Sequence, residues 1–342
     1  MGTQHCTILG IVLRCCCAPT VGHSKLEKNL KNKLIKLDNW VESIIVDPLS
    51  KEPLAANEDN YLTSSYGRKY PVINGIYDLR LLNNETTQDQ KVWNEGQREY
   101  KRWSKNIASQ DRKQDYFKEI EDVREVYEEI PIEGRCLDVG GHHGKLRHFL
   151  LSGQEYITCD PFLGGFDDIE KQPNLINAYP FLLEPVNFIC CDAEFLPFSS
   201  SSFHTVHMRS VIDHFLSPEL ALNEAYRVLE ADGVLIVGLL VHGGKKGKPD
   251  IKSLSKEFIR AILVAAGLNR FKDYHVWHPS FKELTDLITV CGFKIEKVHW
   301  QKCWNDRVCY IRAKKLLGLT RQILAPRKVR IVGKLATNSM FK

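Results

Sequence analysis

The sequence predicts an α/β fold, a doubly wound, Rossmann-like parallel sheet with helices on both of its faces. The first observation is a series of three apolar segments suited to buried strands, each ending in an acid: Asp138, Asp160 and Asp192. The second is a glycine-bearing turn, Gly140 to Gly144, directly after the first of these segments. Such a turn lets a ligand lie against bare backbone, and it is typical of α/β proteins that bind nucleotide-like molecules.

The glycine turn predicts a cofactor site. Gly140, Gly141 and Gly144 are expected to contact the cofactor, and a helix beginning near Lys145 would offer it unpaired N–H groups. The dinucleotide fingerprint would need glycines where His142 and Lys145 stand, so S-adenosylmethionine fits better than NAD. His142 and His143 are adjacent on the turn and have no partner at zinc-ligand spacing, so the turn predicts no metal.

The strand-end acids predict the rest of the cofactor contacts. Asp160 follows Asp138 by 22 residues, close to the spacing of about 20 at which a carboxylate reaches a ribose diol. Asp192 would accept a hydrogen bond from the adenine amino group, and Ala193 would present its backbone N–H.

The segment Asp192-Ala-Glu-Phe-Leu-Pro-Phe198 resembles a marker of one broad group of class I S-adenosylmethionine-dependent methyltransferases. The similarity extends from about Arg135 to Lys315 and includes Gly233–Val237 as a fifth strand. This resemblance implies an enzyme with S-adenosylmethionine as cofactor and a seven-stranded sheet whose last strand is reversed. It also implies cofactor contacts from Met208 and Arg209.

Catalytic candidates follow the fourth strand of the resemblance. His214, beside Asp213, is expected to be the general base, although His214 could equally line the methionine end of the cofactor. Segments that shape the acceptor pocket in this family suggest five substrate-side residues: Tyr100, Trp103, His275, Trp277 and His278. No Asn/Asp-Pro-Pro-Tyr/Phe motif follows the fourth strand, which disfavours methylation of exocyclic base nitrogens.

The expected acceptor is a hydroxyl or carboxyl of a small molecule, lipid or sugar. An RNA or protein methyltransferase is the alternative within enzymes, and a catalytically silent cofactor-binding scaffold is the alternative outside them.

An N-terminal segment, Ile44–Leu54 with Tyr61–Leu79, is similar to the small zinc-ribbon proteins that activate methyltransferases. Asp47, Ser50, Thr63 and Ser64 occupy the expected cysteine positions, so no metal is predicted here. A module without zinc must fold by packing against something else, and the methyltransferase domain is the expected surface. No separate activator subunit should then be needed.

The chain is divided into five predicted regions. Residues 1–23 are a disordered extension, and 24–82 hold an amphipathic helix from Leu26 to about Ile45 followed by the ribbon-like module. Residues 83–130 are a connector of two helices broken near Ser109–Asp111. Residues 131–315 are the methyltransferase domain, with late helices at Ser253–Ala266 and from Phe281 and final strands at 294–300 and 307–313. Residues 316–342 are a basic tail.

Composition predicts a globular protein of the cytoplasm. Of the 342 residues, 43% are hydrophobic and 26% charged, and no run approaches the roughly 18 apolar residues of a membrane span. The 11 cysteines lie mostly in apolar strands, as expected of reduced thiols. Beyond Asp306 there is no acid, and leucines alternate with basic residues. This tail could touch an anionic membrane surface or nucleic-acid phosphates, or pack on the domain as a solvated helix.

Overall fold

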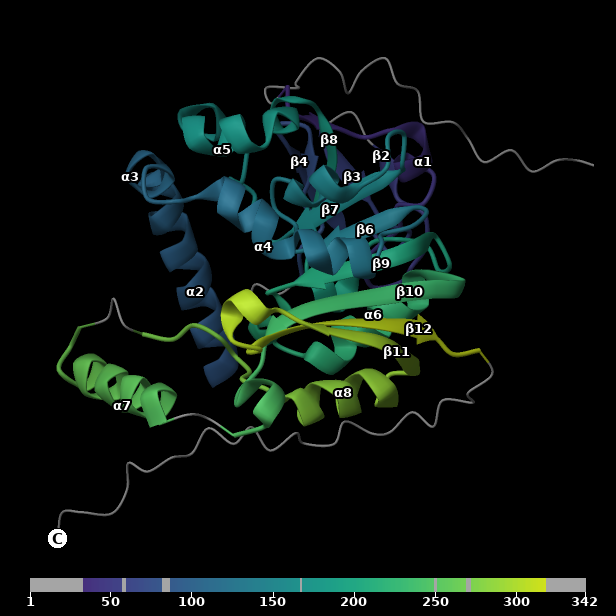
Figure 1. Ribbon diagram of the computed structural model, residues 1–342. Coiled ribbons are helices and arrows are strands. Elements are labelled where there is room, and N and C mark those ends of the chain that lie inside the picture. The colour runs from purple at the N-terminus through teal and green to yellow at the C-terminus, as the bar shows by residue number, and fades with distance from the viewer. Residues whose placement is uncertain are drawn as a thin grey trace, which may run out of the picture.

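A central sheet of eight strands organises the computed structural model (Figure 1). The structure describes residues 33–56, 60–81, 87–166, 168–248, 251–268 and 272–317. The strand order is β1-β8-β7-β6-β9-β10-β12-β11, and β12 runs antiparallel to both of its neighbours. The strands are β1 (Ile35–Lys36), β6 (Cys136–Val139), β7 (Tyr156–Asp160), β8 (Val186–Cys190), β9 (Phe203–Arg209), β10 (Leu229–Leu240), β11 (Phe293–Trp300) and β12 (Val308–Lys315). The predicted doubly wound sheet with a reversed last strand is confirmed.

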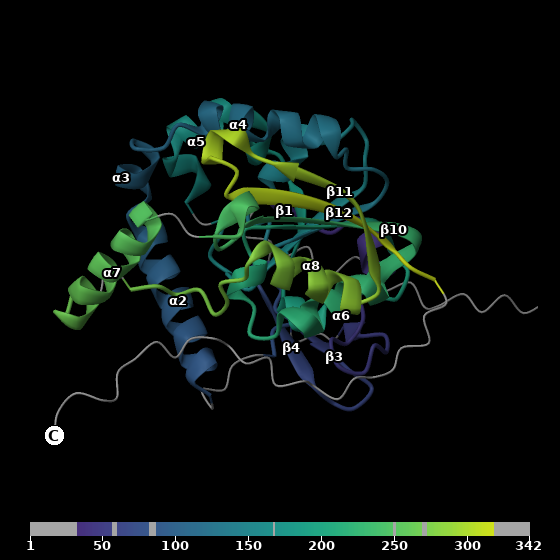
Figure 2. The same cartoon turned by 60° about the horizontal axis from the view of Figure 1, so that its bottom comes forward.

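Helices cover both faces of this sheet (Figure 2). Alternate strand residues point to opposite faces, so Leu137 and Val139 join one core cluster and Cys136 joins the other. The first cluster includes α6 (Pro218–Val228) and α8 (Phe281–Val290), and the second includes α4 (Tyr116–Glu129) and α5 (Pro173–Ala178). The remaining helices are α1 (Asn39–Glu42), α2 (Gln88–Lys105), α3 (Ile107–Asp111) and α7 (Ile251–Ala265). No helix in the described ranges combines the length and apolar character needed to cross a membrane.

Three local predictions differ from the structure. Within the described part of the helix predicted over Leu26 to about Ile45, Ile35–Lys36 is a strand and only Asn39–Glu42 is helical. Ile35 pairs in parallel with Val186 at the edge of the sheet, and its side chain is buried there, which outweighs helical periodicity. This strand is also why the sheet has eight strands rather than seven.

The helix predicted to begin near Lys145 is a short 3₁₀ helix, Lys145–Phe149. Leu150 is already extended, and the chain must reach β7 at Tyr156, so no further helical turn forms. In the connector, the helical break falls at Asn106 and again at residues 112–115, giving three helices where two were predicted. The helices predicted at Ser253–Ala266 and from Phe281 are present as α7 and α8.

The N-terminal module is a four-stranded antiparallel sheet, β2 (Ala55–Ala56), β3 (Tyr61–Thr63), β4 (Lys69–Ile73) and β5 (Ile76–Tyr77). Its apolar residues Leu62, Tyr70 and Tyr77 belong to the same core cluster as α6 and one face of the large sheet. The module therefore packs on the large sheet, as we expected of a module without zinc.

Asp47 holds the first turn of this module together. Its Oδ1 accepts hydrogen bonds from the backbone N–H groups of Leu49 at 2.7 Å and Ser50 at 2.8 Å, and its Oδ2 accepts one from the Tyr70 hydroxyl at 2.9 Å. Burial alone would raise the pKa of Asp47, but the hydrogen bonds from Ser50, Leu49 and Tyr70 bring it below its ordinary value. A buried carboxylate thus organises this turn.

The predicted 1–23 extension and almost all of the 316–342 tail lie outside the described residues.

Candidate active site

A cavity of about 730 Å³ opens where the parallel strands β6, β7, β8 and β9 end. Ligands of open α/β sheets bind at this edge because the loops after the strands converge there. Helix α2 and residues 272–275 close the remaining sides. Nine predicted site residues line the cavity: Tyr100, Trp103, Gly140, Asp160, Asp192, Ala193, Arg209, His214 and His275.

A second cavity of about 380 Å³ adjoins the first and shares Gly140, His142 and Arg209 with it. Gly141 lies in its wall beside Lys145 and Glu119. The Lys145 ammonium contacts Glu119 Oε1 at 2.7 Å, and an Arg209 guanidinium nitrogen lies 3.6 Å from the same oxygen. One carboxylate thus pairs with two cations beside the glycine turn.

Asp138 supports the glycine turn from below and is almost fully buried. Its Oδ1 lies 2.8 Å from His207 Nδ1, and its Oδ2 accepts a hydrogen bond from the Tyr156 hydroxyl at 2.7 Å. A Cβ on Gly141 would lie 2.0 Å from that Oδ2. Asp138 was predicted to contact the cofactor, and the structure commits both of its oxygens to protein groups that fix the turn.

Asp160 ends β7 in the wall of the larger cavity. Its Oδ1 accepts a hydrogen bond from the Phe162 N–H at 2.8 Å. Burial raises the pKa of Asp160 to about 7, because the ionised form loses its hydration there. A buried carboxyl at a cavity wall gains from hydroxyl donors, which supports the predicted ribose contact.

Asp192 and Ala193 follow β8 in the same wall. The Leu81 N–H donates to Asp192 Oδ2 at 2.6 Å, and Leu79 N–H donates to the Cys190 carbonyl at 2.8 Å. The end of the N-terminal module therefore borders the predicted adenine position. The Leu81 hydrogen bond occupies one carboxylate oxygen of Asp192, the residue that was predicted to accept from the adenine amino group.

His142 replaces the usual middle glycine with a left-handed φ of 48°. Its Nδ1 lies 2.8 Å from His143 Nδ1, and its ring meets Tyr100 edge-on at 5.6 Å. Burial, together with the charge of Lys145, lowers the pKa of His142 to about 3, so the ring is neutral. The turn thus keeps the backbone path that a glycine would take, while the imidazole becomes part of the cavity wall.

Five predicted site residues line neither cavity: Asp213, which is described below, and four others. Met208 is fully buried in the core, because it points to the opposite face of β9 from His207. Gly144 has a φ of 77° and packs beside the Tyr156 ring, where it shapes the turn without lining it. Trp277 packs against the core cluster, and His278 hydrogen-bonds Asp273 at 3.1 Å.

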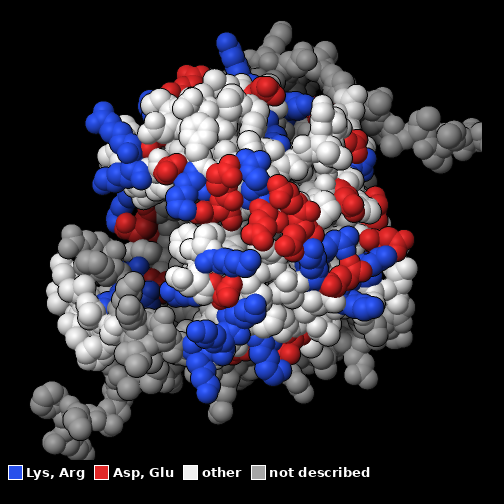
Figure 3. Space-filling model, viewed as in Figure 1, with Lys and Arg blue, Asp and Glu red and all other residues white. Residues whose placement is uncertain are grey.

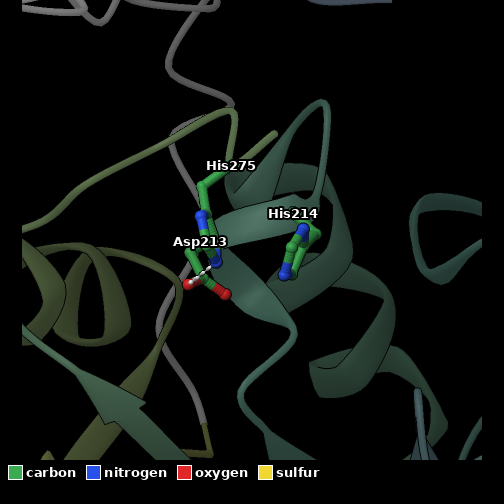
Figure 4. Close-up of side chains that lie close together, drawn as sticks. All are labelled: Asp213, His214 and His275. Atoms are coloured by element: carbon green, nitrogen blue, oxygen red, sulfur yellow. Dashed lines mark ion pairs between the residues drawn. The ribbon is translucent and has the colours of Figure 1, made fainter. Parts of the chain in front are cut away.

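The acceptor-end cluster, which we define as Asp213, His214 and His275, lies at the polar end of the larger cavity, and His214 and His275 line its wall. Figure 4 shows how the three side chains lie. His275 Nε2 lies 3.5 Å from Asp213 Oδ2, and the His214 and His275 rings are 4.3 Å apart. The Asp213 carbonyl accepts hydrogen bonds from the N–H groups of Val276 and Trp277, which fasten the 272–280 loop to the end of β9. The predicted catalytic pair and a predicted substrate-side residue are thereby brought together.

Sequence reasoning missed several residues of this end of the cavity. Asp273 Oδ1 lies 2.6 Å from His275 Nδ1, and Arg260 lies 2.8 Å from Asp273 Oδ2. The Asp-x-His-x-x-His spacing from Asp273 to His278 was the signal that could have revealed the first of these. Trp93 and Tyr274 also line the cavity. Helical periodicity alone could not distinguish Trp93 from a core aromatic, and Tyr274 lies in a loop without a motif.

The residues of the larger cavity fit S-adenosylmethionine. Asp160 offers a buried carboxylate for a diol, and Gly140 has a φ of 72° at a point where a Cβ would lie 2.4 Å from Val211. The turn can therefore approach a ligand only because the position is glycine.

Comparisons with known proteins agree with this architecture. Residues 137–237 match the family model described as a methyltransferase domain. Curated protein sequences give no match.

Solved structures with a similar arrangement include a SAM-dependent methyltransferase from Thermotoga maritima. It is 22% identical, covers 66% of this chain and 99% of its own, and has a TM-score of 0.39. Another is the 1,6-didemethyltoxoflavin-N1-methyltransferase of Burkholderia thailandensis with S-adenosylhomocysteine bound. It is 11% identical, covers 77% of this chain and 99% of its own, and has a TM-score of 0.44. Residues 137–237, which include the parallel strands β6 to β9, are therefore similar to a methyltransferase domain.

Proposed function

We propose that this protein transfers the methyl group of S-adenosylmethionine to a hydroxyl or carboxyl oxygen of a small molecule, lipid or sugar. The observation that carries the proposal is the single cavity joining Asp160 and Asp192 at one end to His214 and His275 at the other. Its volume of about 730 Å³ lies within the 300–1,000 Å³ typical of small-molecule sites. Trp93, Tyr100 and Trp103 give this cavity aromatic walls.

The chain's own residues hold and orient the reactants. Asp160, Asp192 and Ala193 bind the nucleoside part of the cofactor, and the acceptor-end cluster receives the acceptor oxygen. When bound, S-adenosylmethionine supplies an electrophilic methyl group on a positively charged sulfur. The acceptor oxygen forms a bond to the methyl carbon while the carbon–sulfur bond breaks. The electron pair of the broken bond remains on sulfur. The proton of a hydroxyl acceptor passes to the acceptor-end cluster, in which His214 is the predicted base.

The distribution of charge supports a small acceptor over RNA. Acidic side chains form a band across the face in Figure 3, where Figure 1 draws α4. This helix contributes the exposed residues Glu121, Glu125, Glu128 and Glu129. Such a band repels phosphates, and basic residues are scattered around it. No disulfide joins the cysteines that the structure describes, which is compatible with the proposed cytoplasmic location.

Transfer of a labelled methyl group tests the proposal. The purified chain is incubated with labelled cofactor and fractionated cell extract, and label is expected in small-molecule, lipid or sugar fractions. Asp160→Ala should weaken S-adenosylhomocysteine binding by roughly 1.5–3 kcal/mol in calorimetry, because it removes charge-assisted hydrogen bonds. Asp168→Asn is a matched control, since Asp168 pairs with Lys171 in a surface turn.

Label that enters RNA or protein instead would overturn the proposed acceptor class. Cofactor binding without transfer to any fraction would favour a catalytically silent scaffold.

A further inference from the structure

The acceptor-end cluster is also a set of metal-binding donors. We propose that Asp213, His214 and His275 bind a divalent first-row transition metal ion. This inference deepens the proposed function and depends on it only for the identity of the acceptor.

The donor atoms already lie close enough for a shared ion. One ligand atom from each of Asp213, His214 and His275 falls within 4.8 Å of the other two. Two imidazoles and one carboxylate suit zinc, iron, manganese or cobalt, whereas magnesium and calcium prefer oxygen ligands throughout. Such a triad leaves coordination positions open for a substrate oxygen.

Asp213 provides an independent observation. Its Oδ1 is buried and has no hydrogen-bond partner among the described residues, although its Oδ2 faces His275. A buried carboxylate oxygen without a partner costs about 1–3 kcal/mol or more. A cation between Asp213 and the two imidazoles would supply the missing interaction.

The surroundings of His275 provide a second independent observation. Its Nδ1 lies 2.6 Å from Asp273 Oδ1, and its Nε2 is left facing Asp213. Histidine ligands of metals commonly donate their second N–H to a carboxylate, which fixes the ring and its tautomer. Asp273 is positioned in turn by His278 and Arg260.

Two other groups of donors are less suited to an ion. Asp273, His275 and His278 also lie close together, but the Arg260 guanidinium is 2.8 Å from Asp273 Oδ2 and would repel a cation. In the group Glu125, Glu129 and His299, Lys297 already pairs with Glu129 at 3.1 Å.

A bound ion would change how the acceptor loses its proton. An oxygen ligated by a divalent metal has a lowered pKa, so a hydroxyl acceptor would release its proton to solvent. His214 would then be a ligand instead of the base. The sequence predicted no metal at this place because His275 is distant in the chain from Asp213 and His214 and no ligand motif joins them.

Direct binding tests the site without any acceptor. The full chain, without a histidine tag and treated with chelator, is titrated with Zn²⁺ by calorimetry and with Co²⁺ by visible absorption. One ion per chain should bind, Co²⁺ should show ligand-field bands, and Mg²⁺ should not compete. Asp213→Asn and His214→Gln should each weaken Zn²⁺ binding by about 100-fold or more, and Asp273→Asn by about 10–100-fold.

His204→Ala is the matched control and should leave Zn²⁺ affinity unchanged, since His204 lies at the start of β9, where it pairs with Glu230 and contacts none of the triad. S-adenosylhomocysteine binding and thermal unfolding show whether each variant is folded. Absence of stoichiometric binding by the wild type overturns the inference, as does binding that His204→Ala abolishes and His214→Gln does not. Zn²⁺ binding without methyl transfer would leave the site standing and remove only the proposed function. Methyl transfer by a chain that binds no metal would overturn the metal site and leave the proposed function standing.

Discussion

The Tyr156 hydroxyl donates a hydrogen bond to Asp138 Oδ2 at 2.7 Å, in the space directly behind Gly141. This contact makes the shape of the cofactor turn depend on β7 as well as on the glycines. It also explains why Gly141 must lack a side chain although its φ is not left-handed.

Gly141→Ala should destabilise the protein by about 1–3 kcal/mol and weaken cofactor binding. The added Cβ would lie 2.0 Å from Asp138 Oδ2 and 2.6 Å from Thr158 Oγ1, both of them buried. Denaturant unfolding and calorimetry with S-adenosylhomocysteine measure the two effects. Gly153→Ala is the comparison, because Gly153 has a φ of 79° with open space around its Cβ. That variant should cost stability through backbone strain and leave cofactor affinity intact. Equal cofactor affinity in both variants would contradict the crowding argument.

The free energy of unfolding should depend on pH through Asp160. Its pKa of about 7 in the folded protein lies above the ordinary value of 3.8, so the folded state holds the proton more tightly. The resulting stabilisation is complete below pH of about 4 and is lost as pH rises to about 7. Asp160→Asn cannot ionise, so the variant should gain stability relative to wild type between pH 5 and 7. Unfolding curves at several pH values check this, and parallel pH profiles of the two proteins would refute the assignment. Glu194, whose pKa is also about 7, is present in both proteins and does not affect the difference.

Asp47→Ala should destabilise the chain by about 3 kcal/mol or more, because three donors lose a charged acceptor. Ser50→Ala should change stability little, since the Ser50 hydroxyl accepts only a weak bond from Glu52 N–H at 3.4 Å. Both are measured by equilibrium unfolding. Chelator should not alter the effect of Asp47→Ala, since we expect no metal in this module. A chelator-dependent loss of stability that Asp47→Ala removes would show that the module binds metal.

Truncation after Lys315 tests the basic tail, most of which lies outside the described residues. We expect the full chain to bind vesicles or to bind nothing, rather than to bind RNA. If the tail engages membranes, the chain should co-sediment with anionic vesicles, at about 1 kcal/mol per basic residue near the surface, and not with neutral ones. The truncated chain should lose this binding and keep its cofactor affinity. RNA binding that falls steeply with salt and disappears on truncation would instead favour nucleic acid as the partner.

Much of the sheet could be predicted from sequence because its strands are short apolar runs, and three of them end in an acid. Asp160 and Asp192 then lie at one edge of the sheet simply because parallel strands end together. The acceptor-end cluster could be predicted only in part. Asp213 and His214 follow a strand, but His275 reaches them through a loop whose path depends on hydrogen bonds to the Asp213 carbonyl.

Other contacts had no sequence signal. His207 is an ordinary residue of β9 in sequence, and only the packing of neighbouring strands shows that it holds Asp138. The strand Ile35–Lys36 was hidden within a helical pattern, because its pairing partner Val186 is far away in the chain.

The pairing of β1 has a consequence for how the domain behaves on its own. Ile35–Lys36 hydrogen-bonds along the start of β8, and Asp78–Leu79 bridges to Cys190 at its end. Together these two N-terminal pieces cover the outer side of β8 at both of its ends. A fragment of residues 131–315 would present that side as a bare strand edge, ready to pair with another molecule. The N-terminal segment therefore covers a strand edge that would otherwise be free to pair with another molecule.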